Sequence, residues 1–231
     1  MTEGKGPRNR RAVRWFPPSL AGQCLRYAVM DLLGFGRAID PDGLLAMQAG
    51  AVLHRQFQAE LKREYAESVA VEVRIRSEEL GVSGRMDAVW QRAEGAAVIE
   101  YKTVHREKFD DLAETGPLVG HWAQLLLYLD VTGHPLGYLI VECRETGRRR
   151  TWRTGPDQAW QGWVRARIQW ARAHQASRTL PAREVSQACR QCDRWRRCFA
   201  SETEREQAIL RHPVWEPSPP VPAVYPGVVQ A

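Results

Sequence analysis

Residues 82–102 read VSGRMDAVWQRAEGAAVIEYK, and this stretch decides the fold. It contains two apolar runs separated by a short turn that includes Gly95, a pattern typical of a β-hairpin. Glu100 and Lys102 lie two positions apart, so their side chains share one face of the second strand. Pairing across the turn brings Asp87 near that same face. We therefore predict a hairpin that presents two carboxylates and an amine together.

Two carboxylates and a lysine that converge on one face can bind Mg²⁺ or Mn²⁺ and assist attack on a phosphodiester. Such a metal lowers the pKa of a bound water. Lys102 would orient or help to deprotonate that water and stabilise the developing negative charge. A surface salt-bridge ladder is the alternative, and it is the commoner explanation of an isolated D…E-x-K pattern. The choice depends on the other motifs of the chain.

Three further residues support a metal site over a salt-bridge ladder. His54 lies in the middle of an expected helix, where its imidazole can supply a metal ligand. Gln124 and Tyr128 are four positions apart in a segment with helical spacing, which places them on one helical face. Their polar ends can hold a phosphate or the lysine in place. A structural histidine and two helix-edge residues are the alternative explanations.

The cysteines form two groups that are far apart in the sequence. Cys24 stands alone, whereas Cys189, Cys192 and Cys198 form a C-x2-C-x5-C cluster. Four thiolates can hold either an iron–sulfur cluster or a tetrahedral Zn²⁺. Zinc usually binds two tight C-x2-C pairs, so the single distant cysteine favours the iron–sulfur cluster. Cys143 lies in an apolar, strand-like run and is assigned to the core.

The histidine, the aspartate, the E-x-K triplet and the Q-x3-Y pair occur in the motif order of the RecB-like branch of the PD-(D/E)XK nucleases. The chain resembles that branch over about residues 15–200, and its opening PPSLAGQCLRYAVMDLLGF is similar to the N-terminal helix of the branch. The cysteine pattern is similar to that of the iron–sulfur members, which include the CRISPR-associated Cas-four exonucleases, AddB-type nuclease domains and related phage enzymes. The resemblance implies metal ligands at His54, Asp87, Glu100 and the Tyr101 carbonyl, catalytic roles for Asp87, Glu100, Lys102, Gln124 and Tyr128, and an iron–sulfur (4Fe-4S) cluster on Cys24, Cys189, Cys192 and Cys198.

The order of the expected elements indicates an α/β fold, with a PD-(D/E)XK restriction-endonuclease-like core in which helices flank a small mixed sheet. An iron–sulfur lobe formed by both chain ends is added to it. We expect a flexible basic arm over residues 1–14, a single RecB-like nuclease domain over 15–205, and a proline-rich tail over 206–231 that forms no regular element. Helices are expected over residues 19–33, 43–65, 117–131 and 156–177, and strands over 69–75, 82–90, 96–101, 136–143 and 148–153.

The first two helices carry more detailed expectations. Ser19 should cap the first helix, which places Cys24 in its second turn. The second helix should bury one apolar stripe. The residues near that face are Leu45, Val52, Leu53, Phe57, Leu61 and Tyr65.

Composition is compatible with a polyanionic partner, because the 231 residues carry a formal net charge of +6 and an isoelectric point near 9.3. No stretch approaches the about 20 apolar residues of a membrane span. An odd number of cysteines, five, fits a reduced metal site better than a disulfide framework, and we expect a cytoplasmic protein without membrane partners. Arginines of the C-terminal region can contact a DNA backbone or form a solvated helix face; among them are Arg165, Arg167, Arg183, Arg190 and Arg194.

Together these features predict a metal-dependent DNA nuclease, specifically a single-strand DNA exonuclease in CRISPR adaptation or in DNA repair and recombination. Its partners would be DNA with free ends and either a CRISPR integration complex or other repair proteins. The preference for ends and the cellular process come only from the resemblance. Two other classes stay open: a non-catalytic DNA-binding or complex-assembly subunit, which the intact D…E-x-K disfavours, and an iron–sulfur redox regulator.

Overall fold

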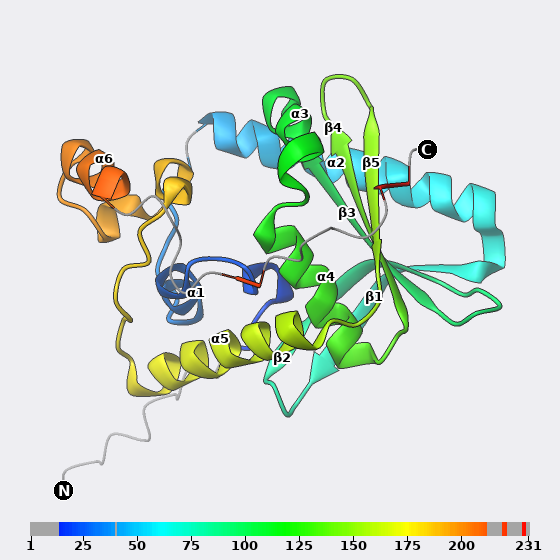
Figure 1. Ribbon diagram of the computed structural model, residues 1–231, viewed down its shortest axis with the longest axis horizontal. Helices are drawn as coiled ribbons and strands as arrows, with labels where there is room; N and C mark the ends of the chain where they lie inside the picture. The colour runs from blue at the N-terminus through cyan, green and yellow to red at the C-terminus, as the bar shows by residue number, and fades with distance from the viewer. Residues whose placement is uncertain (1–13, 40, 212–218, 221–227, 230–231) are drawn as a thin grey trace, which may run out of the picture.

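A mixed β-sheet flanked by helices forms the centre of the protein (Figure 1). The computed structural model describes residues 14–39, 41–211, 219–220 and 228–229. The strands occur in the sheet in chain order, and every neighbouring pair is antiparallel except β3 and β4, which are parallel. The strands are β1 (Val69–Ser77), β2 (Val82–Trp90), β3 (Ala97–Val104), β4 (Leu136–Cys143), β5 (Arg149–Thr154) and the two-residue β6 (Val228–Val229).

The helices cover both faces of this sheet. The parallel β3–β4 pair needs a crossover connection, and two helices, α3 and α4, provide it. Residues 122–129 of α4 are all buried, as expected of a helix enclosed between the sheet and a second helix layer. The helices are α1 (Leu25–Leu32), α2 (Pro41–Tyr65), α3 (Arg106–Thr115), α4 (Val119–Thr132), α5 (Gln158–Ser177) and α6 (Glu202–Arg211), with 3-10 turns at Pro18–Leu20, Ala66–Ser68, Gln187–Gln191 and Trp195–Arg197.

Two apolar cores lie on opposite faces of the sheet. The larger core joins α1, α4 and α5 to side chains such as Val98 and Leu139. The smaller core packs Phe57 and Leu61 of α2 against Ile99 and neighbouring residues. Since Val98 and Ile99 are adjacent in β3, their side chains point to opposite faces, and so α2 and α4 enclose the sheet between them. This arrangement places α2 and α4 on either side of the predicted acidic hairpin.

The predicted α/β fold with a small mixed sheet and flanking helices is confirmed, and each of the five predicted strands is present. The helix predicted over residues 19–33 is wrong at its start, because α1 begins at Leu25 and Cys24 is its N-cap residue. The cause is a close contact with α4. A Cβ on Gly22 would lie 2.5 Å from the Cα of Gly120, so the chain bends here to pass along α4.

The predicted stripe of α2 is only partly buried. Phe57 and Leu61 lie in the smaller core, but the exposed fractions of Leu45 and Val52 are 62% and 43%. Helices α3 and α6 were not predicted. The tail over residues 206–231 was expected to form no regular element, but residues 206–211 belong to α6 and the two residues of β6 pair with β5. The basic arm, except its last residue, and most of the proline-rich tail lie outside the described residues. Among the described helices, none combines the length and the apolar character required to cross a membrane.

Candidate active site

The acidic hairpin opens at the position where its carboxylates lie. Pairing of β2 with β3 runs from Trp90↔Ala97 to Ala88↔Ile99 and ends there. Asp87 and Glu100 would form the next pair, so they lie at the fork where the two strands separate. On its other side β2 pairs with β1, and that ladder also omits the position of Asp87. The side chains at the fork are therefore held by specific contacts in addition to the sheet.

Asp87 is hydrogen-bonded to β3 and lies close to a side chain of α2. Its Oδ2 accepts a hydrogen bond of 2.8 Å from the backbone N–H of Tyr101, and its Oδ1 lies 3.5 Å from Nδ1 of His54. The ring of Tyr101 contacts both the imidazole of His54 and the ring of Phe57, with centroid distances of 4.9 and 4.2 Å. This packing fixes the direction of the imidazole. The structure thus brings His54 and Asp87 together from two elements that are distant in the sequence.

Glu100 is a buried carboxylate with an incomplete set of partners. Only 1% of its surface is exposed, and Nζ of Lys102 lies 2.5 Å from its Oε1. Its Oε2 has no hydrogen-bond partner among the described residues. Burial raises the pKa of Glu100 to about 8; Lys102 opposes this shift and Asp87 adds to it. Burial opposes the charge on Lys102, but Glu100 and Asp87 outweigh that effect and raise its pKa.

Gln124 and Tyr128 lie on the side of α4 that meets the hairpin. Nε2 of Gln124 donates to the phenol oxygen of Tyr128 at 3.0 Å, and that hydroxyl donates to the backbone carbonyl of Arg85 at 2.5 Å. Burial, followed by the charge of Glu100, raises the pKa of Tyr128. The predicted i, i+4 pair therefore faces the site. Through Tyr128 it links α4 to β2 at Arg85, two residues before Asp87.

His121 lies at the site but was not predicted from the sequence. It lies one turn before Gln124 on α4, and burial, together with the charge of Lys102, lowers its pKa to about 3. Its imidazole is therefore neutral at physiological pH, and its Nδ1 has no hydrogen-bond partner within the described part of the chain. The H-x2-Q spacing was the available signal, because residues at i and i+3 share a helical face.

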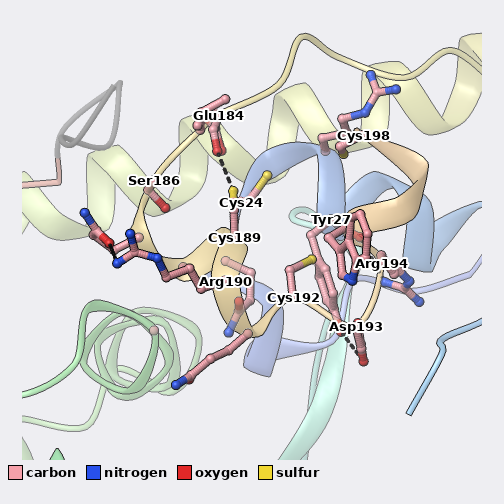
Figure 2. A pocket seen from close by; sticks show the side chains of 18 of the residues that line it. Cys24, Tyr27, Glu184, Ser186, Cys189, Arg190, Cys192, Asp193, Arg194 and Cys198 are labelled. Atoms are coloured by element: carbon pink, nitrogen blue, oxygen red, sulfur yellow. Dashed lines mark hydrogen bonds between the residues drawn. The ribbon is translucent and has the colours of Figure 1, made fainter. Parts of the chain in front are cut away.

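The cysteines from the two ends of the chain meet at one cavity (Figure 2). The cavity has a volume of about 880 Å³, and Cys24, Cys189, Cys192 and Cys198 all line it. All four are free thiols, and burial raises the pKa of Cys24 to about 12. Cys143 does not line this cavity; it is buried in β4, as predicted. The four cysteines thus line one cavity, but no three of them, all within the described residues, stand close enough to hold a metal ion as they are placed.

Comparison with known proteins identifies the family. The model of the PD-(D/E)XK nuclease superfamily matches residues 19–199, a stretch that includes the acidic hairpin and all four cavity cysteines. The chain belongs to the PD-(D/E)XK nuclease superfamily. No curated protein sequence matches it significantly.

Solved structures share the fold of this superfamily member. SSO0001 has a TM-score of 0.54 and 20% sequence identity, covering 80% of this chain and 85% of its own. The alkaline exonuclease LHK-Exo from Laribacter hongkongensis has a TM-score of 0.53 and 15% identity, covering 70% of this chain and 88% of its own. The structure of LHK-Exo in complex with dAMP has a TM-score of 0.54 and 16% sequence identity, covering 71% of this chain and 89% of its own. At these identities the likeness concerns the fold.

The site of this PD-(D/E)XK chain offers the donor atoms that a hard divalent cation prefers. Asp87 and Glu100 bring carboxyl oxygens to the fork, the imidazole of His54 lies beside Asp87, and one oxygen of Glu100 has no hydrogen-bond partner among the described residues. In the described residues, no three His, Cys, Asp or Glu side chains stand close enough to hold a metal ion as they are placed. Nζ of Lys102 instead lies against one carboxyl oxygen of Glu100. In the type of its donor atoms, carboxyl oxygens with one imidazole, this set fits Mg²⁺ or Mn²⁺.

Two buried arginines join the cysteine segment to the first helix. Arg167 donates to both carboxylate oxygens of Glu184 at 2.9 and 2.8 Å, and Glu184 also accepts from the backbone N–H of Leu25. Arg194 donates to Oδ1 of Asp31 at 2.8 Å. Both arginines are almost completely buried, so neither is placed to contact a DNA backbone. The ion pairs keep both chain ends together around the cavity.

Proposed function

We propose that this chain is a divalent-metal-dependent deoxyribonuclease that acts on free ends of single-stranded DNA. The observation that carries the proposal is the environment of Glu100, a buried carboxyl group beside Asp87 and Lys102, with one oxygen to which no described residue donates a hydrogen bond. Leaving a buried carboxylate oxygen without a hydrogen bond costs free energy, and such groups persist where function needs them. A fork that opens toward two carboxylates and one lysine is suited to phosphodiester hydrolysis.

A bound Mg²⁺ or Mn²⁺ would be held by His54, Asp87, Glu100 and the carbonyl of Tyr101. When bound, the ion would supply a water of lowered pKa and neutralise charge on the scissile phosphate. Asp87 is already oriented by the N–H of Tyr101, and His54 by its packing on the Tyr101 ring. These contacts keep the ligands in place before substrate arrives, which reduces the reorganisation that catalysis requires.

Lys102 would act on the reacting groups directly. Its ammonium lies against Glu100, and the charges of Glu100 and Asp87 raise its pKa, which keeps it charged at neutral pH. From this position it would orient the attacking water and stabilise negative charge that develops on the phosphate. Gln124 and Tyr128 would have a positioning role, because the Tyr128 hydroxyl fixes the backbone of β2 next to Asp87.

We further propose that Cys24, Cys189, Cys192 and Cys198 hold a structural 4Fe-4S cluster. The support is that all four thiols line one cavity although one of them comes from the opposite end of the domain. Thiolates are the ligands of such clusters, and iron binding would displace the protons that burial now retains on the thiols. The proposed process, CRISPR adaptation or DNA repair, rests on the resemblance of this cysteine pattern to the Cas-four exonucleases.

A nuclease assay tests the proposed activity. End-labelled linear and circular single-stranded DNA would be incubated with the protein and Mg²⁺ or Mn²⁺, with EDTA as the metal-free control. We expect the linear substrate to be degraded, and Lys102→Ala to lower kcat by at least about 100-fold. Lys62→Ala, which removes an exposed lysine of α2, is the matched control and should retain full activity. Full activity of Lys102→Ala, or no cleavage with either metal, would contradict the proposal.

A further inference from the structure

A strained residue of β1 lies directly across from Asp87. The β1–β2 ladder contains Val71↔Ala88 and Val73↔Met86 but omits the intervening pair, Glu72 and Asp87. Glu72 has a φ of +54°, a left-handed conformation that is costly for a residue with a long side chain. Strain of this kind persists where surrounding contacts impose it, often beside a functional site.

Glu72 is held by two side chains at the edge of the fork. Its Oε1 accepts from Nε2 of Gln58 at 2.7 Å, and its Oε2 forms an ion pair of 2.9 Å with Arg85. Gln58 lies one turn after His54 on α2, so both project from the same side of that helix. A chain of contacts thus extends from α2 through Glu72 to Arg85, alongside the contact between His54 and Asp87.

Arg85 is well placed to meet a strand of nucleic acid. It lies two residues before Asp87 on β2, about 7 Å away along the strand. Its backbone carbonyl is fixed by Tyr128, whereas 60% of its side chain is exposed. Arg74 of β1 is its direct cross-strand partner. Like charges placed opposite one another destabilise a sheet, so this pair is better explained by an anionic ligand than by stability.

We propose that Arg85 binds the phosphate next to the scissile phosphate of a single-stranded DNA substrate, and that Glu72 holds Arg85 in position until DNA displaces it. The spacing from Arg85 to Asp87 is similar to the distance between successive phosphates of an extended strand. Glu72 is a positioning residue: in the absence of DNA its carboxylate pairs with the Arg85 guanidinium at the place where the phosphate would bind. The inference rests on the proposed nuclease function and assigns its substrate-binding residue.

Binding of fluorescein-labelled single-stranded DNA, measured by anisotropy over a series of salt concentrations, tests this assignment. All variants carry Lys102→Ala so that the DNA stays intact. Arg85→Ala should weaken binding about fivefold and reduce the slope of log affinity against log salt by about 0.7, the value of one phosphate contact. Arg85→Lys should restore the slope. Arg63→Ala removes an exposed arginine from the side of α2 opposite His54 and should change neither quantity.

Glu72→Gln provides the second measurement. It keeps the size of the side chain but removes the competing charge, so we expect about two- to fivefold tighter binding of DNA. Glu72→Gly, which tolerates the positive φ, should give the same direction if the glutamine variant fails to fold. An unchanged affinity and slope in Arg85→Ala, with a lower Tm as its only effect, would overturn this inference alone. Absence of DNA binding in every variant would overturn it together with the proposed function.

Discussion

Glu100→Gln should stabilise the metal-free protein at alkaline pH. Folded Glu100, with a pKa of about 8, retains its proton in a range where the same group in the unfolded chain, with a pKa near 4.5, has released it. The folded state therefore binds more protons between these values, and the free energy of unfolding falls as pH rises through this window. The contribution of the Glu100 proton is fully present below about pH 4.5 and is lost by about pH 8. Glutamine has no such proton to lose.

The size of this effect follows from the shift. One pKa unit corresponds to about 1.4 kcal/mol, so the difference between 4.5 and about 8 corresponds to about 5 kcal/mol. The value of about 8 already includes the opposing effect of Lys102, and neither titration is complete at the two pH values compared, so the measured difference is smaller than about 5 kcal/mol. We expect the stability of the variant relative to wild type to improve by about 2–4 kcal/mol between pH 4.5 and pH 8.5.

Urea unfolding in EDTA, followed by tryptophan fluorescence and circular dichroism at both pH values, measures this difference. Glu142→Gln is the matched control, since Glu142 is also buried in the sheet but accepts from Arg149 at 2.6 Å. Glu142→Gln removes the charge that pairs with Arg149 and should destabilise the protein to a similar extent at both pH values. Mg²⁺ at about 100 times its dissociation constant should stabilise wild type by about 2.7 kcal/mol at pH 8.5 and Glu100→Gln by far less. A stability difference between wild type and Glu100→Gln that is equal at the two pH values would refute the reasoning.

Three further outcomes are expected. Lys102→Ala should still bind single-stranded DNA, with an affinity that falls as salt rises, and an affinity indifferent to salt would argue against phosphate contacts. Anaerobically purified protein should be brown, with about four iron and four sulfide per chain, and Cys24→Ser should bleach it; colourless protein with stoichiometric zinc would exclude the cluster but keep the four-cysteine site. Glu184→Ala should lower the free energy of unfolding by about 3–5 kcal/mol, because Arg167 then loses its buried carboxylate partner. Urea unfolding measures this loss, and Glu202→Ala, which removes an exposed carboxylate, should change the stability much less.

The sequence predicted the elements whose signals are local. Alternation of apolar and polar residues identified the strands, and the i, i+4 spacing placed Gln124 and Tyr128 on one face, as their hydrogen bond shows. Where a distant contact decides the backbone, the prediction was wrong. Gly22 bends the chain because it packs on Gly120, nearly 100 positions away, and no pattern within residues 19–33 reports that contact. The apolar first half of α2 likewise reads as a buried stripe, although Leu45 is exposed.

The sequence by itself determined which chemical groups this protein carries, namely the histidine, the carboxylates, the lysine and the four cysteines, and the superfamily to which it belongs. Only the tertiary structure decided where these groups lie, how deeply they are buried and how their pKa values shift. The early end of the β2–β3 ladder places Asp87 and Glu100 at a fork, and burial there raises the pKa of Glu100. The contact of Glu72 with Arg85 and the common cavity of the cysteines arise in the same way. Desolvation and charge coupling depend on distances in space, and those distances join residues that the sequence leaves far apart.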